Sequence, residues 1–360
     1  MDIVNISSVL RTSIIPRMQS LPADIYSVAS VREIDRTAIE DHGIPGYTLM
    51  TRAGAAALRA ARRRFPDAKR WQVVCGGGNN GGDGYVVARL AANAGIIVSV
   101  LTLVDPQALR RDAAKAYRDF VAEGGVVMPW NGELDAEAEL LVDAILGSGL
   151  ERDLAGEYAR AVAAINEHEA GVMSLDIPTG INGDTGKLLG SAVKADLSVT
   201  FVGLKKGLFL DRGGEYCGEL HYDGLKIPDK CRANVSAEFR RVDDALMRHA
   251  FPPRRRTAHK GDFGHVLVIG GGEGMPGAVR LCGEAALRAG AGRVSIATAP
   301  SHAAVLTATR PELMSHAIEG PADFEPLLEK ADVLAFGPGL GLSDWARALF
   351  DIVAADTRPA

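Results

Sequence analysis

Short apolar runs alternate with longer segments of helical periodicity between about residue 30 and residue 225. The apolar runs predict strands at 71–75, 96–104, 139–146, 171–178, 196–202 and 218–225. Apolar residues at helical spacing predict helices at 30–42, 46–65, 83–94, 106–123 and 155–168. Apolar strands that alternate with helices are typical of a mostly parallel sheet covered on both faces. We therefore expect a three-layer αβα domain with a Rossmann-like fold.

A second α/β pattern follows a polar segment. Residues 226–258 carry Pro252-Pro253 and the arginine run Arg254–Arg256, which predicts a solvated connection. The pattern then predicts strands at 264–272, 293–298 and 331–341 and helices at 277–290 and 343–355. We therefore expect a domain at 24–235, a linker at 236–258 and a partial α/β domain at 259–360, because the chain stops where a further strand is due.

The first 23 residues lack either pattern. Their apolar pieces are short and are broken by Arg11, Pro16 and Arg17, so they fit neither a signal peptide nor a membrane helix. We expect a disordered extension, or a misassigned start in place of Met18.

Composition narrows the class of protein. The length of 360 residues favours two domains, and no apolar run approaches the roughly 18 residues of a membrane helix. A net charge of −5 gives no basic surface for nucleic acid. The four cysteines form no CxxC pair, which indicates reduced thiols. These features predict a cytoplasmic protein without nucleic-acid or membrane partners; we also expect a homo-oligomer.

A glycine-rich loop follows the first predicted strand of the sheet. In GGGNNGGDG, Gly76–Gly81 matches G-x-G-x-x-G, as does Gly272–Gly277 further on, and Asp105 lies at a plausible distance for a ribose-binding acid. Asp83, however, would compete with a pyrophosphate for the amides of the following helix. The loop therefore suits close ligand approach, but not a simple dinucleotide site. The alternative is a tight turn in which Asp83 only caps the helix.

Two further polar loops end neighbouring strands. They are DAILGSGLERD at 143–153 and LDIPTGINGDTG at 175–186. The carboxyl ends of parallel strands share one edge, so we expect these loops and the glycine loop to meet in one oxygen-lined cleft. Asn80, Asp143 and Thr179 would offer an amide, a carboxylate and a hydroxyl, which suit an alkali or alkaline-earth cation and not zinc.

These three blocks, in this order and spacing, resemble the signature blocks of the NAD(P)H-hydrate epimerase family. HKGDFGHVLVIGGGEGMPGAVRLCGEAALRAGAGRV, followed by ADVLAFGPGLG, is similar to the opening of the ADP/ATP-dependent NAD(P)H-hydrate dehydratase family, which has a ribokinase-like fold. The two in tandem resemble the bacterial bifunctional NAD(P)H-hydrate repair enzymes over nearly all of 24–360.

The resemblance implies a set of site residues. Contacts with hydrated NADH or NADPH would come from Asn79, Asn80, Gly81, Gly82, Asp83, Gly147, Ser148, Gly149, Leu150, Glu151, Arg152, Asp153 and Asp176. Potassium (K+) would be held by Asn80, Asp143 and Thr179, and Asp176 is our candidate for the catalytic acid/base. In the second domain Ala278, Gly339 and Gly341 would line a dehydratase site that uses ADP or ATP and Mg²⁺.

The expected activity is interconversion of the R and S forms of hydrated NAD(P)H. The family's later TPHPGE-like and GTGD-like blocks are absent from the sequence, so we expect no complete dehydratase site. Three alternatives stay open: an NAD(P)-dependent oxidoreductase, supported by the two G-x-G-x-x-G matches, a non-catalytic nucleotide-binding protein, and a sugar or vitamin kinase. A carbonyl-dependent absorbance change of NAD(P)H would favour the first, and ligand binding without epimer exchange the second.

Overall fold

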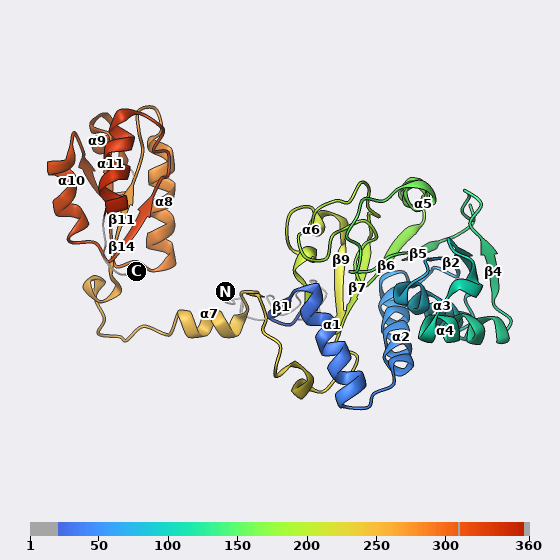
Figure 1. The fold of residues 1–360 in the computed structure, drawn as a ribbon. Coiled ribbons are helices and arrows are strands. Elements are labelled where there is room, and N and C mark those ends of the chain that lie inside the picture. The colour runs from blue at the N-terminus through green and yellow to red at the C-terminus, as the bar shows by residue number, and fades with distance from the viewer. Residues whose placement is uncertain (1–20, 309, 356–360) are drawn as a thin grey trace, which may run out of the picture. The chain divides into compact units, whose positions relative to one another are not determined.

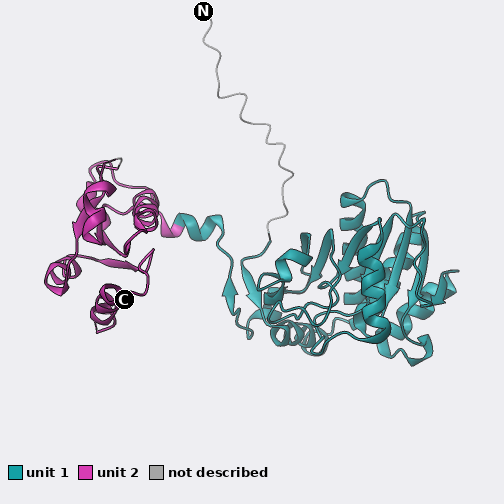
Figure 2. Cartoon of the chain, turned by 90° about the horizontal axis from the view of Figure 1, so that it is seen from above, with its two compact units in different colours: residues 1–248 teal, residues 249–360 magenta. Residues whose placement is uncertain are grey.

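The computed structural model describes residues 21–308 and 310–355. The chain forms two compact units, residues 1–248 and 249–360, each with its own parallel sheet (Figure 2). The predicted extension at 1–23 falls outside the described residues up to position 20.

The first unit is built on a seven-stranded sheet in which every neighbouring pair of strands is parallel. The strand order is β4-β3-β2-β5-β6-β7-β9 (Figure 1). The strands are β2 (Arg70–Cys75), β3 (Ile97–Thr102), β4 (Val126–Pro129), β5 (Leu140–Ala144), β6 (Gly171–Leu175), β7 (Leu197–Phe201) and β9 (Glu219–Asp223). Only β4 has no predicted counterpart, since a four-residue edge strand with mostly exposed side chains carries little periodicity.

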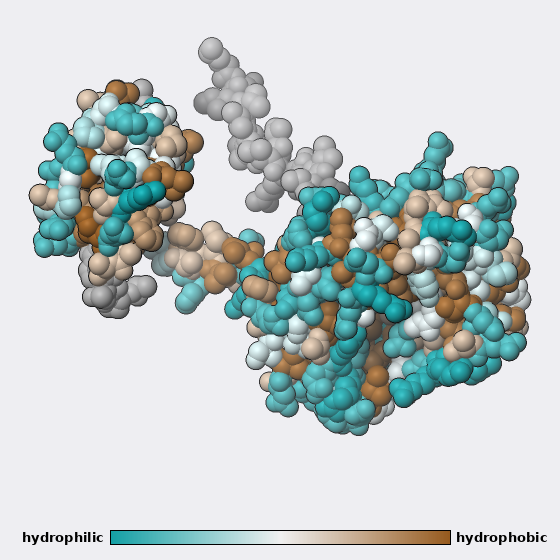
Figure 3. All heavy atoms as spheres, turned by 45° about the horizontal axis from the view of Figure 1, so that its top comes forward, coloured by the Kyte–Doolittle hydropathy of each residue, from teal (hydrophilic) through white to brown (hydrophobic). Residues whose placement is uncertain are grey.

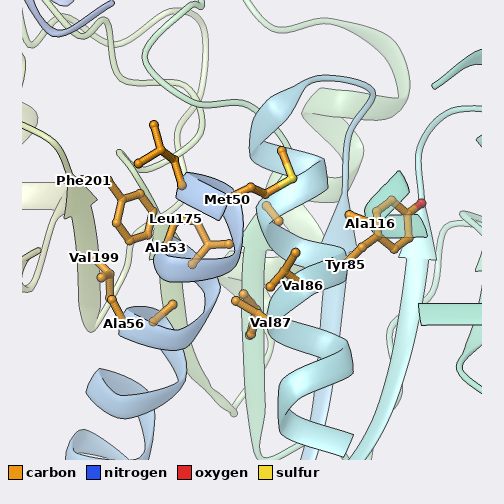
Figure 4. Packing of buried hydrophobic residues seen from close by; sticks show 14 of the residues in the cluster. Met50, Ala53, Ala56, Tyr85, Val86, Val87, Ala116, Leu175, Val199 and Phe201 are labelled. Atoms are coloured by element: carbon orange, nitrogen blue, oxygen red, sulfur yellow. The ribbon is translucent and has the colours of Figure 1, made fainter. Parts of the chain in front are cut away.

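Helices cover both faces of this sheet. On one face lie α2 (Gly46–Arg64), α3 (Asn79–Asn93) and α4 (Arg111–Ala122), and on the other lies α5 (Gly156–Glu167). Figure 4 shows the larger core, in which Ala53 and Ala56 of α2 lie between Val199 of β7 and Val86 of α3. The predicted three-layer αβα architecture is confirmed.

Helix α3 begins four residues earlier than predicted, because tertiary packing overrides the poor helix propensity of glycine. A Cβ on Gly81 would overlap the Gly76 carbonyl, and a Cβ on Gly84 would lie 2.5 Å from the Ala144 side chain. The helix starts at Asn79 with Gly78 as its N-cap, so Asp83 stands in its second turn. The alternative interpretation of Asp83 as a helix cap is therefore wrong.

A small three-stranded sheet stands beside the large one. It joins β1 (Asp24–Tyr26) to β8 (Leu204–Lys205) in parallel and to β10 (Phe239–Arg240) in antiparallel orientation. Strand β10 lies inside the predicted linker 236–258 but pairs within the first unit. Strands of two or three residues leave no period to detect. The remaining helices of this unit are α1 (Val28–Arg36), α6 (Gly213–Tyr216) and α7 (Asp244–Ala250), the last extending across the boundary between the units.

The second unit has a four-stranded parallel sheet in the order β13-β12-β11-β14. Its strands are β11 (His265–Ile269), β12 (Arg293–Thr298), β13 (Met314–Ala317) and β14 (Val333–Phe336), and its helices are α8 (Pro276–Ala289), α9 (Pro300–Leu306), α10 (Pro321–Leu328) and α11 (Asp344–Ala355). Leu267 and Val268 of β11 belong to different apolar clusters, as expected when successive side chains point to opposite faces. The predicted α/β character is confirmed.

Among the described residues, no helix is both long and apolar enough to cross a membrane. On the face of the first unit seen in Figure 3, hydrophilic side chains predominate and hydrophobic ones are scattered among them.

Candidate active site

The strand order of the first sheet reverses between β2 and β5. From β2 the chain adds β3 and β4 on one side, and then returns to place β5, β6, β7 and β9 on the other. In open parallel sheets, ligands bind outside the carboxyl ends of the strands at such a reversal, where the connecting segments diverge and leave a crevice. The segments that follow β2 and β5 are the glycine loop and residues 145–155.

A cavity of about 1140 Å³ lies at this edge. All seven predicted residues from Gly147 to Asp153 line it, as do Asn79, Asn80, Asp83 and Asp176. Helix α2 adds an apolar wall of Leu49, Met50 and Ala53. Small-molecule sites typically enclose about 300–1,000 Å³, so this cavity has room for a nucleotide-sized ligand.

Asp176 follows β6 in a left-handed conformation with a φ of 69°. Asp and Asn adopt this region more readily than other non-glycine residues, and such backbone strain concentrates at functional sites. Its Oδ2 accepts a hydrogen bond from the Ser148 amide at 3.1 Å, and its Oδ1 forms an ion pair with the Lys205 ammonium. Burial by itself would raise the pKa of Asp176, but these two donors outweigh it and hold the pKa below its usual range. The carboxylate is therefore ionised at neutral pH.

Lys205 was not predicted from the sequence. Its side chain is only 2% exposed, and its ammonium also donates to Thr200 Oγ1 at 3.1 Å and to the Phe201 carbonyl at 2.8 Å. It belongs to the two-residue strand β8, which the small sheet holds against β1. The GLKKG segment contains two adjacent lysines and no periodic signal, so only the tertiary structure distinguishes Lys205.

Two further carboxyl groups share this cavity. Burial raises the pKa of Asp35, on α1, to about 6; Lys205 opposes this rise and Asp176 adds to it. Burial also raises the pKa of Asp83 well above its usual value, with Asp176 and Asp35 adding repulsion. Asp35, like Lys205, was not predicted, since an acid on an amphipathic helix is normally solvated.

Asp143 and Thr179 lie beneath the cavity and do not line it. The Asp143 carboxylate, fully buried, accepts from the Thr179 hydroxyl at 2.7 Å, the Thr179 amide at 2.9 Å and the Ser174 hydroxyl at 2.8 Å. Thr179 Oγ1 in turn accepts from the Leu146 amide at 3.0 Å. The pair ties the turn after β6 to the cavity-lining segment after β5. The expectation of a single cleft thus fits Asn80 and Asp176, whereas Asp143 supports that cleft from below.

Asn80 is 8% exposed, and neither its amide oxygen nor its amide nitrogen has a hydrogen-bond partner among the described residues. Leaving a buried amide unpaired costs about 1–3 kcal/mol, so the group calls for a bound ligand or ion. A Cβ on Gly147 would lie 3.5 Å from the Asn80 side chain and 3.1 Å from Asp176 Oδ2. The two predicted residues therefore approach the cavity at the same point.

Gly81 and Gly82 do not line the cavity, although the resemblance assigns them to it. A Cβ on Gly82 would lie 2.7 Å from Met50 Cε and 3.0 Å from the Ala113 Cα. Gly81 lies against the backbone of Gly76, and Gly82 allows α3 to pack closely on α2 and α4. The interpretation that glycine is needed for a ligand to approach the backbone therefore does not apply to these two positions. Gly78 does line the cavity, and a Cβ there would meet open space.

The structure does not support the oxidoreductase alternative, because the acid expected to bind the ribose, Asp105, lies outside the cavity. Asp105 caps a short 3-10 helix by accepting from the Gln107 amide at 2.9 Å, and it is not among the residues that line the cavity.

In the second unit the predicted residues lie together. A Cβ on Gly339 would lie 2.9 Å from the Cβ of Ala278 on α8, and Gly341 lies close to the Met275 side chain. Both glycines have positive φ, at 61° and 76°, which explains why glycine stands at these positions.

The fold and the cavity define an α/β protein with a nucleotide-sized site at the reversal of a parallel sheet, where a carboxylate–lysine pair can act on a ligand. Residues 46–207 match the family model described as YjeF-related protein N-terminus. Residues 266–360 match the model described as NAD(P)H-hydrate dehydratase.

Curated relatives contain both matches in one chain. The bifunctional NAD(P)H-hydrate repair enzyme Nnr of Coxiella burnetii is 44% identical over 91% of this chain and 67% of its own. The enzyme of the same name from Escherichia coli strain K12 is 40% identical over 91% of this chain and 63% of its own. The chain belongs to the family of bifunctional NAD(P)H-hydrate repair enzymes, and it spans about two thirds of the length of these relatives.

A solved structure supports the fold of the first unit. The crystal structure of the yeast protein ynu0 superposes with a TM-score of 0.50 at 21% identity, covering 57% of this chain and 91% of that one.

Proposed function

We propose that the first unit interconverts the R and S epimers of hydrated NADH and NADPH. The observation that carries this proposal is the ionised Asp176, held by buried Lys205 at the wall of a nucleotide-sized cavity. Family membership supplies the substrate class, since the relatives are named for NAD(P)H-hydrate repair.

The chemistry requires proton transfer and charge stabilisation. The substrate carries a hydroxyl on C6 of the reduced nicotinamide ring, next to N1. When that hydroxyl is protonated, the N1 lone pair expels it as water and leaves an iminium cation. Water can then add to either face of C6, and loss of its proton gives either epimer.

Asp176 suits the cationic stage of this reaction. Its lowered pKa keeps it ionised, so it can stabilise the positive charge of the iminium cation. The cost of desolvating this carboxylate is already offset by Lys205 in the folded protein.

The opposite end of the ligand is anionic. Gly78, Asn79 and Asn80 place the N-terminus of α3 at the cavity, where backbone amides and the helix dipole favour phosphate. Arg32 and Arg152 add positive charge to the same wall. The apolar side chains of α2 offer a surface for a flat ring.

Potassium fits the residues named for it by the type of their oxygen atoms. Asn80, Asp143 and Thr179 provide amide, carboxylate and hydroxyl oxygens, and the unpaired Asn80 amide is the observation that favours a bound ion. Such an ion would offset the negative charge of the buried Asp143 carboxylate and fix Asn80.

For the second unit we propose the substrate side of a dehydratase that uses ADP or ATP with Mg²⁺. Ala278, Gly339 and Gly341 would line it, and their close approach supports this assignment. Self-association of the chain stays a prediction.

Asp176→Asn tests the proposed function. Asn tolerates the left-handed backbone and keeps an oxygen that can accept from Ser148 and Lys205, so the variant should fold, but its neutral side chain cannot stabilise the cation. We expect epimer exchange to fall about 100-fold or more, measured by proton NMR of separated R and S hydrates. Turnover at the wild-type rate would remove Asp176 from this role, and absence of exchange in the wild type would exclude epimerase activity.

A further inference from the structure

Proton donation to the leaving hydroxyl needs a carboxylic acid, and Asp176 is poorly suited to it. Both of its oxygens accept hydrogen bonds, one from the Lys205 ammonium and the other from the Ser148 amide. Protonating Asp176 would break the ion pair and leave the Lys205 charge buried at 2% exposure without its counter-ion. The donor must therefore be another group at the cavity.

Asp35 is better placed than Asp176 to donate a proton. It lines the cavity from α1, and among the described residues no donor bonds to its carboxyl group. The charged groups that share the cavity wall with it are Arg32 on its own helix, Asp83 on α3, Asp112 on α4, Glu151, Arg152 and Asp153 after β5, Asp176 after β6 and Lys205 on β8. One of these carboxylates, Asp176, repels a negative charge on Asp35, whereas Lys205 attracts it.

Asp83 is the competing donor. Burial and both neighbouring carboxylates raise its pKa well above the usual value, which makes it a weaker acid than a solvated carboxyl group. Epimerisation needs one group to give a proton to the leaving hydroxyl and to take one back from the entering water. A group that titrates near neutral pH does both, and burial with repulsion from Asp176 brings the pKa of Asp35 to about 6.

We propose that Asp35 is a second catalytic residue of the first unit, which protonates the C6 hydroxyl of the substrate as it leaves while Asp176 stays ionised. This inference rests on the proposed epimerase function. The Asp35 O–H bond and the substrate C6–O bond break, water forms, and the N1 lone pair becomes the N1=C6 bond. Water then adds to C6, its proton returns to Asp35, and the electron pair returns to N1, so no oxidant or reductant is consumed.

Asp35→Asn, Asp35→Glu and the control Glu33→Gln test this assignment. Glu33 lies on the same helix, is exposed, and pairs with Arg36 outside the cavity. The substrate is NADH hydrate, because the 2′-phosphate of the NADPH form itself titrates near pH 6. The kcat/KM for epimer exchange is measured from pH 5.5 to 8.5 after subtraction of the uncatalysed rate, and binding of NADH is measured by calorimetry.

For Asp35→Asn we expect kcat/KM to fall about 100-fold with NADH affinity unchanged, partial recovery in Asp35→Glu, and wild-type activity in Glu33→Gln. The wild-type kcat/KM should decline about tenfold per pH unit above the pKa of Asp35, and the residual activity of Asp35→Asn should lack this decline. Full activity of Asp35→Asn, or the same alkaline decline in it, would overturn the inference alone. Absence of exchange in the wild type would overturn it together with the proposed function.

Discussion

At the residue scale, the site depends on one buried cation among three acids. Lys205 interacts with Asp35, Asp83 and Asp176, but it donates a hydrogen bond only to Asp176 among them. The three acids therefore differ in pKa: the pKa of Asp176 is lowered, whereas the pKa values of Asp35 and Asp83 are raised. Separation of pKa values among neighbouring acids is how protein sites divide acid and base roles.

Lys205→Met should destabilise the first unit by about 3 kcal/mol, because it leaves the buried Asp176 carboxylate without its counter-charge. The check is denaturant unfolding at pH 7. Lys205→Met combined with Asp176→Asn should recover part of the loss, since no unpaired charge then remains. A double variant as unstable as the sum of the two singles would mean that the ion pair does not account for the effect.

Asp35 should also make the stability of the first unit depend on pH. Its folded pKa of about 6 lies above the ordinary value of an aspartate side chain, so the folded state binds the extra proton. This contribution is complete below about pH 4 and is lost as the pH rises through 6. Asp35→Asn should therefore flatten this decline and gain roughly 1–3 kcal/mol at pH 7 relative to wild type. Thermal unfolding at pH 4, 5, 6 and 7 measures the effect, and parallel curves would contradict it.

At the element scale, the glycines of helix α3 allow it to pack closely against its neighbours. Gly81 lies against the Gly76 backbone, Gly82 against Met50 on α2 and Ala113 on α4, and Gly84 against Ala144 on β5 and Cys75 on β2, while Asn80 and Asp83 line the cavity. The same residues that look like a phosphate loop in the sequence thus bring the helix end close enough to the sheet to line the cavity.

Gly84→Ala should destabilise the first unit by about 1–2 kcal/mol. The substitution gains up to about 1 kcal/mol of helix propensity, but the new Cβ meets the Ala144 Cβ at 2.5 Å and Cys75 Sγ at 2.8 Å, and overpacking costs about 1–3 kcal/mol. The matched control is Gly277→Ala in α8, where a Cβ meets open space and propensity alone predicts a small gain. Calorimetry that resolves the unfolding transitions of the two units decides between these effects.

At the scale of the whole molecule, the two units fold around separate cores. The apolar clusters of the first unit end with Val235, and those of the second begin with Val266. Residues 250–257 between them are exposed. Separate cores favour separate sites, one in each unit.

Brief trypsin treatment should cleave first after Arg255 or Arg256. Both are exposed, whereas Arg254 lies over the Phe263 ring at 3.8 Å and donates to the Gly290 carbonyl. We expect two fragments by mass spectrometry, with epimer exchange retained by the N-terminal one. First cleavage inside residues 24–235, or loss of exchange on cleavage at 255–256, would contradict this division of function.

The sequence by itself determined what short-range patterns encode. Apolar runs such as 71–75 and 139–146 identified strands of the parallel sheet, and the loops after them identified the carboxyl edge where Asn80 and Asp176 meet. These features depend on neighbours within a few residues, so they can be recognised without coordinates.

Only the tertiary structure decided which charged groups interact with one another. Asp35 on α1, Asp176 after β6 and Lys205 on β8 are distant in the chain, and nothing near them in sequence marks them as partners. It also decided that the glycines of α3 serve packing and that Asp143 lies below the cavity. Burial and electrostatic coupling are properties of a folded surrounding, because the field at one carboxyl group depends on every charge that folding brings near it.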